Sequence, residues 1–175
     1  MSQPTAQRHE QSAIVKDMQK HVNLVAVRLL RSSSQIYSIP NPVPSEWTID
    51  LAVKVGGRKP PEASGVIHAM AGVVASVRGP LDPPGKLVAQ IDCEFLLDYK
   101  IDNEELYARI SDQDVASFSA TNGVYNAWPY ARAHCQSIAA SMMLIIVLPS
   151  FRVDLFSDLL PKVQAAAVAA AAKPK

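Results

Sequence analysis

The chain has 175 residues, 17 of them Lys or Arg and 16 Asp or Glu, and 49% of its residues are hydrophobic. This length fits one domain with a buried core, and a net charge of +1 excludes the strong positive field that is typical of nucleic-acid-binding proteins. The first ten residues lack the apolar region of a signal peptide, and the longest apolar run, residues 138–149, is too short to cross a bilayer. We therefore expect a cytoplasmic protein with no nucleic-acid partner and no membrane insertion.

The N-terminal part predicts a helical arm followed by a long strand. Residues 7–20 mix apolar and polar side chains in a pattern that favours a short helix or a partly ordered arm. Residues 21–39 are rich in aliphatic side chains but are interrupted by the polar run 31–34, which predicts a long strand with an irregular middle. Prolines at positions 40, 42 and 44 cannot donate to a strand ladder, so an extended connection should follow.

Three further segments predict strands. Residues 47–55 alternate, with Trp47 and every second residue after it apolar, and residues 87–97 alternate in the same way. Between them, residues 66–78 form a run rich in β-branched residues and alanine that is bounded by turns with Gly and Pro. Four strands joined by short connections predict an antiparallel meander with one polar face.

The C-terminal half predicts helices. A first helix should start after the capping residue Asn103, and the sequence at 121–123 should interrupt it. A second helix, rich in Ala and Ser, should run over residues 124–143, and an amphipathic helix over 153–163 should precede an alanine-rich tail.

Motifs for nucleotide, metal or nucleophile chemistry are missing from the sequence. Neither a P-loop nor a dinucleotide-binding glycine motif is present, and neither is the serine-hydrolase elbow. Cys93 and Cys135 lie in apolar segments without metal-binding spacing, so we expect reduced, buried thiols. His134 and Cys135 are adjacent on a predicted helix and point about 100° apart, which is unsuitable for one metal ion. The acidic residues between 98 and 114 span a strand end, a loop and a helix, which favours a solvated face. We expect no enzyme, no cofactor and no metal.

The sequence WPYAR at residues 128–132 resembles the aromatic-Pro-Tyr-Ala-Arg helix start of the SecB family of export chaperones. The order of elements around it is also similar to SecB: four antiparallel strands before it, Leu-Pro at 148–149 after it, and DLF at 154–156 in a closing helix. Together these features cover roughly residues 21–160.

Three shorter matches support the resemblance. IYSIPN at residues 36–41 resembles the end of the family's first strand, and IDL at 49–51 resembles its second strand. RLLR at 28–31 is similar to the SecB-like chaperones of toxin–antitoxin systems. The resemblance implies an α+β protomer with a four-stranded antiparallel sheet followed by a long helix and a C-terminal helix.

In domain terms, the resemblance implies a chaperone domain over residues 21–163. It would lie between the N-terminal arm, residues 1–20, and an alanine-rich tail, residues 164–175. Family members assemble as a dimer of dimers, so the resemblance also implies a homotetramer.

The function implied by the resemblance is that of an ATP-independent holdase. Its clients would be unfolded preproteins destined for export or an antitoxin, and SecA would be a partner in export. A holdase needs an exposed apolar surface, and binding of the unfolded state delays folding without nucleotide hydrolysis. Export members are strongly acidic where they engage SecA, whereas this chain is near neutral, which leaves the SecA partnership open.

The resemblance also assigns a client-binding groove, at eight positions of this sequence. They are Tyr37, Ile39, Trp47, Ile49, Leu51, Trp128, Leu155 and Phe156. Tyr37 and Trp47 flank the proline-rich connection, where exposure is expected. The family's loop after the long helix is replaced here by the apolar run 142–147, so that wall of the groove should differ.

Two other classes of function stay open. One is a small-ligand-binding or enzymatic α+β domain in which Tyr130, Arg132 and His134 converge on a pocket. The other is a structural oligomerisation module that uses the small-residue helix and the alanine-rich tail as interface.

Overall fold

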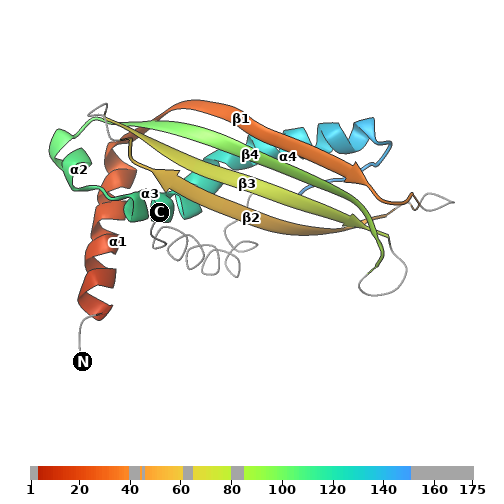
Figure 1. Ribbon diagram of the computed structural model, residues 1–175, viewed down its shortest axis with the longest axis horizontal. Helices are drawn as coiled ribbons and strands as arrows, with labels where there is room; N and C mark the ends of the chain where they lie inside the picture. Colours follow the sequence, from red (N-terminus) through yellow and green to blue (C-terminus); the bar gives the residue numbers. More distant parts are fainter. Residues whose placement is uncertain (1–3, 40–43, 45, 61–64, 80–84, 151–175) are drawn as a thin grey trace.

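The computed structural model describes residues 4–39, 44, 46–60, 65–79 and 85–150. Four antiparallel strands form one sheet in the spatial order β1-β4-β3-β2 (Figure 1). They are β1 (Val22–Ile36), β2 (Thr48–Arg58), β3 (Val66–Arg78) and β4 (Leu87–Ile101). The predicted four-stranded antiparallel sheet is confirmed. The predicted meander is wrong for β1, because this strand pairs with β4 and the chain then crosses to β2 at the opposite edge.

Alternation of side chains decides which face of the sheet is buried. Along β4, Ile91, Cys93 and the following odd-numbered residues are buried, whereas the residues between them are only partly covered. β3 pairs with β4 so that Val73 lies opposite Cys93, and β2 pairs with β3 without a register shift. The inner face of the sheet therefore carries the apolar core, and the outer face carries the polar side chains.

β1 is a long, irregular edge strand, but its irregularities do not lie in the polar run 31–34, where the sequence predicts them. Its register against β4 shifts at Val25 and again at Leu30, each of which is an extra residue without a partner position. Both are exposed, at 64% and 51%. The serine run 32–34, where the sequence predicts the irregularity, pairs regularly with β4. The bulges bend and twist this edge.

The helices lie on the inner face of the sheet and at one end of it (Figure 1). They are α1 (Pro4–His21), α2 (Glu104–Arg109), α3 (Asp112–Phe118), the π-helical turn η1 (Ser119–Gly123) and α4 (Val124–Ser141). α1 contacts α2 and α3 and buries Met18 completely. Within the described ranges, no helix is both long enough and apolar enough to cross a membrane.

Side-chain caps fix the start of α2 and of α3. Asn103 accepts a hydrogen bond from the N–H of Leu106, which confirms the predicted helix start. Ser111 and Asp114 form a capping box at the start of α3. At the other end of α2, the Lys59 ammonium donates to the carbonyl of Tyr107 at 2.5 Å and lies 3.4 Å from two further carbonyls of this turn. A cation is favourable there because the helix dipole and the unpaired carbonyls are both negative.

α3, η1 and α4 form one continuous helix, so the predicted break at 121–123 is wrong. The residues on both sides of the π-helical turn keep αR backbone angles, and Ser119 in this turn donates to the carbonyl of Met70 in β3 at 2.6 Å. A Cβ on Gly123 would lie 2.7 Å from the Ser119 hydroxyl, so a larger residue there would have to displace the side chain that bonds Met70. Pro129 lies inside α4 rather than at a helix start.

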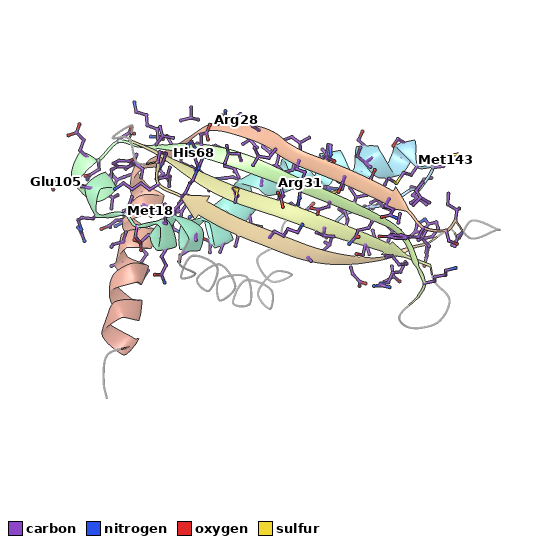
Figure 2. All side chains as sticks on the ribbon, viewed as in Figure 1. Met18, Arg28, Arg31, His68, Glu105 and Met143 are labelled. Atoms are coloured by element: carbon purple, nitrogen blue, oxygen red, sulfur yellow. The ribbon has the colours of Figure 1, made fainter. Side chains whose placement is uncertain are left out.

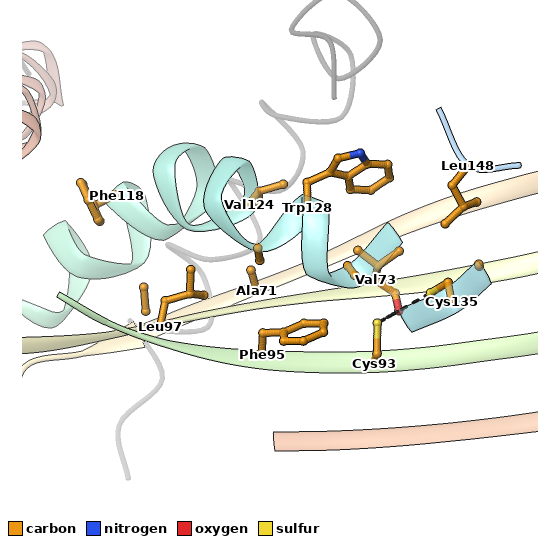
Figure 3. Close-up of a cluster of buried hydrophobic side chains, with 14 of the residues drawn as sticks. Ala71, Val73, Cys93, Phe95, Leu97, Phe118, Val124, Trp128, Cys135 and Leu148 are labelled. Atoms are coloured by element: carbon orange, nitrogen blue, oxygen red, sulfur yellow. Dashed lines mark hydrogen bonds between the residues drawn. The ribbon is translucent and has the colours of Figure 1, made fainter. Parts of the chain in front are cut away.

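Small side chains allow α4 to lie close to the sheet. Ala131, Cys135 and Ala139 are one turn apart and fully or almost fully buried. Beneath them lie the inner side chains of β3 and β4, including Val73 and Phe95 (Figure 3). The core therefore lies between α4 and the middle of the sheet.

Candidate functional site

The end of β1 presents apolar side chains where the chain leaves the sheet. The N–H of Tyr37 donates to the carbonyl of Val88 at 2.8 Å, and its hydroxyl donates to Gln90 Oε1 at 3.4 Å. Tyr37 is nevertheless 47% exposed and Ile39 is 40% exposed. These two residues, which the resemblance assigns to client binding, are accessible.

At the start of β2, Trp47, Ile49 and Leu51 form an apolar row on the inner face. All three are partly buried and pack against the core. α3 covers β2 near its other end, where a Cβ on Gly57 would lie 2.6 Å from a methyl group of Val115. The row therefore retains accessible apolar surface at the end of the sheet where the chain crosses from β1.

The residues at the end of β1 and those at the start of β2 form two groups. β4 and β3 lie between them, so the groups are separated by three interstrand spacings, about 14 Å. This span would accommodate about four residues of an extended chain. One extended polypeptide could therefore reach both groups.

Trp128 is only 2% exposed. Its indole N–H donates to the carbonyl of Pro149 at 3.1 Å, so this side chain holds the chain that follows α4. Trp128 is therefore not part of the accessible surface. Leu155 and Phe156, the remaining members of the set, lie outside the described residues.

Residues 143–148, hereafter the 143–148 segment, form a second accessible apolar surface. Leu144, Ile146 and Leu148 are buried, whereas the intervening Ile145 and Val147 are 85% and 71% exposed. Met143 is 82% exposed and lies toward the end of the sheet at which β1 terminates (Figure 2). All six residues of this run are apolar, so its sequence contains no signal for which side chains are buried and which are exposed.

α4 fixes the 143–148 segment through polar side chains one turn apart. Arg132 donates to the carbonyl of Leu148 at 2.9 Å, and Gln136 donates to that of Ile146 at 3.5 Å. The reversal of the chain is made by Met143, which has a φ of 60°, and the N–H of Leu144 returns to the carbonyl of Ala139 at 2.9 Å. The exposed side chains are therefore displayed on a rigid support.

Bases neutralise the carboxylates on the outer face of the sheet. Asp98 pairs with Arg28 and with His68, whose Nδ1 lies 2.8 Å from its carboxylate. Arg31 and Lys54 lie within 4 Å of both Asp92 and Glu94, and Asp50 pairs with Arg78. Arg28, Arg31 and His68 are labelled on this face in Figure 2. The face is therefore a mixed-charge surface rather than an acidic one.

The three residues of the enzymatic alternative do not meet at one point. His134 Nε2 lies 2.7 Å from the hydroxyl of Ser32 in β1, whereas Arg132 binds the chain after α4. The ring of Tyr130 packs on Phe95, with centroids 6.4 Å apart. In the part of the chain that is described, no carboxylate is hydrogen-bonded to His134, and no cluster of three metal-ligating side chains occurs. A Ser–His contact without an orienting carboxylate lacks the third member of a triad.

Comparison with solved structures identifies the fold. The chain is similar to a SecB-like chaperone of Mycobacterium tuberculosis, solved in complex with a ChAD peptide from the HigA1 antitoxin. The TM-score is 0.65 at 16% identity, and the match covers 80% of this chain and 97% of the chaperone. The protomer thus has a SecB-like α+β fold.

A second structure, a protein of unknown function from Streptococcus agalactiae, matches more weakly. Its TM-score is 0.36 at 9% identity, over 74% of this chain and 97% of that protein. No protein-family model and no curated protein matches the sequence.

Proposed function

We propose that this protein is an ATP-independent holdase that binds unfolded polypeptides. The observation that carries the proposal is the display of uncharged apolar side chains on a SecB-like scaffold: Tyr37 and Ile39 at the end of β1, and Met143, Ile145 and Val147 after α4. Monomeric proteins rarely expose several large apolar side chains together unless these side chains bind a partner.

The chemistry of this surface fits a client of variable sequence. Aliphatic side chains, a methionine and a tyrosine offer apolar area without charged groups that would select one sequence. The backbone N–H and C=O groups of Ile145 and Val147 form no hydrogen bond within the described part of the chain. An extended client could therefore use backbone contacts as well as apolar ones.

Trp47, Ile49 and Leu51 extend the proposed client-binding surface along β2. Because they are only partly buried, a client can cover their remaining apolar area without unfolding the sheet. Preferential binding of the unfolded state delays folding by mass action, so the mechanism needs neither nucleotide nor cofactor.

We further propose an antitoxin or a similar aggregation-prone polypeptide as the client class. The structural neighbour binds an antitoxin peptide, which supports this choice. Delivery of preproteins to SecA receives less support, because every carboxylate on the outer face of the four strands has a basic partner. A basic partner would have to displace those pairs.

A homotetramer built as a dimer of dimers is also part of the proposal. On the inner side of edge strand β1, Leu24 and Leu29 are 42% and 46% exposed, and Tyr130 of α4 is 50% exposed. A second copy that covered this strip would bury apolar area and an open strand edge. We place the assembly in the cytoplasm, where the two free cysteines would stay reduced.

Suppression of aggregation tests the proposed function. Wild-type protein should prevent light scattering by a thermally unfolded client without ATP, and Tyr37→Ser with Trp47→Ser should weaken this effect. The matched control, Tyr37→Phe with Trp47→Phe, keeps the apolar surface and should retain activity. Full activity of the serine variant would refute the assignment of these two residues, and inactivity of the wild type would refute the function.

A further inference from the structure

The two cysteines of this protein face each other across the core. Cys93 comes from β4 and Cys135 from α4, and their sulfur atoms are 3.8 Å apart (Figure 3). Both thiols are free, and both residues are completely buried. Since the sequence contains only these two cysteines, any pairing within one chain is between them.

The packing of α4 brings these thiols together. Ala131 and Ala139 lie one turn before and one turn after Cys135 and are 1% and 0% exposed. Their small side chains allow the helix backbone to lie close to β4. On the other side, the Cys93 thiol lies 3.8 Å from the carbonyl of Val73 in the adjacent strand. The two sulfur atoms are therefore held at van der Waals contact between two layers that are far apart in sequence.

We propose that Cys93 and Cys135 are a site of oxidation at which peroxide forms a disulfide between β4 and α4. A disulfide has an S–S length of about 2.05 Å, so the two sulfur atoms must approach each other by about 1.7 Å. Rotation of the side chains with a small shift of α4 can supply this approach. The proposal does not depend on the holdase function.

The environment assigns a role to each thiol. The hydrogen bond from Cys135 lowers the pKa of Cys93, although burial acts in the opposite direction. The same hydrogen bond and burial raise the pKa of Cys135. Because the thiolate is the nucleophile, this hydrogen bond favours Cys93 as the first sulfur to react, and the same disulfide forms if Cys135 reacts first.

The disulfide forms in two steps. The Cys93 sulfur attacks one peroxide oxygen, the O–O bond breaks, and the departing hydroxide takes the thiol proton, which gives a sulfenic acid and water. The Cys135 sulfur then attacks the Cys93 sulfur, the S–O bond breaks, and the hydroxide takes the Cys135 proton as a second water. The two thiols lose two electrons and two protons in total, and the peroxide is reduced to two waters.

Burial determines the rate of this reaction, and the length of the loop determines its effect on stability. Because neither thiol is exposed, peroxide must enter when α4 transiently separates from the sheet. Oxidation should therefore be much slower than for a solvent-exposed thiol. The disulfide would join residues 42 positions apart, which restricts the unfolded chain. We expect the melting temperature to rise by roughly 5–10 °C.

Mass spectrometry of the full-length protein tests the proposal. The reduced protein is incubated with hydrogen peroxide for hours, unfolded, alkylated and weighed. The expected product has lost about 2 Da, takes up no alkylating group and yields a peptide pair joined through Cys93 and Cys135. Its melting temperature should rise and should return to the initial value after reduction. Cys93→Ser and Cys135→Ser should show neither the mass loss nor the rise.

Three outcomes would overturn the proposal. They are two alkylatable thiols after prolonged exposure, a sulfinic acid on either cysteine with a gain of about 32 Da, and a disulfide that links two chains. If a serine variant fails to fold, the joined peptide pair from the wild-type protein still decides the question.

Discussion

Replacing Ile145 and Val147 with serine tests whether the 143–148 segment binds clients. The two side chains are 85% and 71% exposed, so the free energy of unfolding should change by less than about 0.5 kcal/mol. Burying one branched aliphatic side chain contributes about 1.5–3 kcal/mol. If a client covers half of each side chain, the double variant should bind it with about 2 kcal/mol less binding free energy, which raises Kd roughly 30-fold.

The assay is a titration of a fluorescently labelled polypeptide that reduction and alkylation keep unfolded. The control is Ile145→Leu with Val147→Leu, which keeps the apolar surface and should leave Kd within about threefold of wild type. Thermal melting confirms that the variants are folded. An unchanged Kd in a serine variant that melts like wild type would refute the role of this segment.

Three further predictions concern the scaffold. Gly57→Ala forces a Cβ to within 2.6 Å of Val115, so the melting temperature should fall by several degrees; an unchanged value would mean that α3 shifts freely. Lys59→Met leaves the carbonyls at the end of α2 without their cation, so the free energy of unfolding measured with denaturant should fall by about 1–2 kcal/mol. The control Lys86→Met changes an exposed lysine and should leave this free energy almost unchanged. Burial raises the pKa of Tyr99, so its contribution to stability is complete below its ordinary pKa of about 10 and is lost as the pH rises further. Tyr99→Phe should therefore make the loss of stability above that pH less steep, and an equally steep loss would contradict the assignment.

Local pattern predicted the strands well but not their order. The alternation after Trp47 and the turn-bounded run 66–78 correspond to β2 and β3, because one-sided burial imposes a period of two on a strand. That period does not indicate which strands lie next to each other in the sheet. The pairing of β1 with β4 results from packing over the whole sheet, so the sequence favoured a simple meander.

The helices show a similar limit. Asn103 caps α2 as its side-chain chemistry predicts. Gly123, in contrast, suggested a break but lies within a continuous helix, because a π-helical turn fits it closely against Ser119. Pro129 lies within α4, which a first-turn interpretation of proline does not predict.

Exposure was the property of the candidate site that the sequence could not determine. Tyr37 is accessible and Trp128 is buried, although both are aromatic residues beside a proline-containing segment. Ile145 and Val147 lie in an apolar run that fits a core equally well. The burial of Leu144, Ile146 and Leu148, together with the bonds from Arg132 and Gln136, fixes which side faces solvent. These contacts are long-range consequences of the fold.

The most direct test of the holdase account is the refolding rate of a slow-folding protein measured against increasing concentrations of this protein without nucleotide. The account predicts that refolding slows progressively, saturates when the unfolded client is fully bound, and that the native client does not bind. A refolding rate that stays constant at every concentration would contradict it.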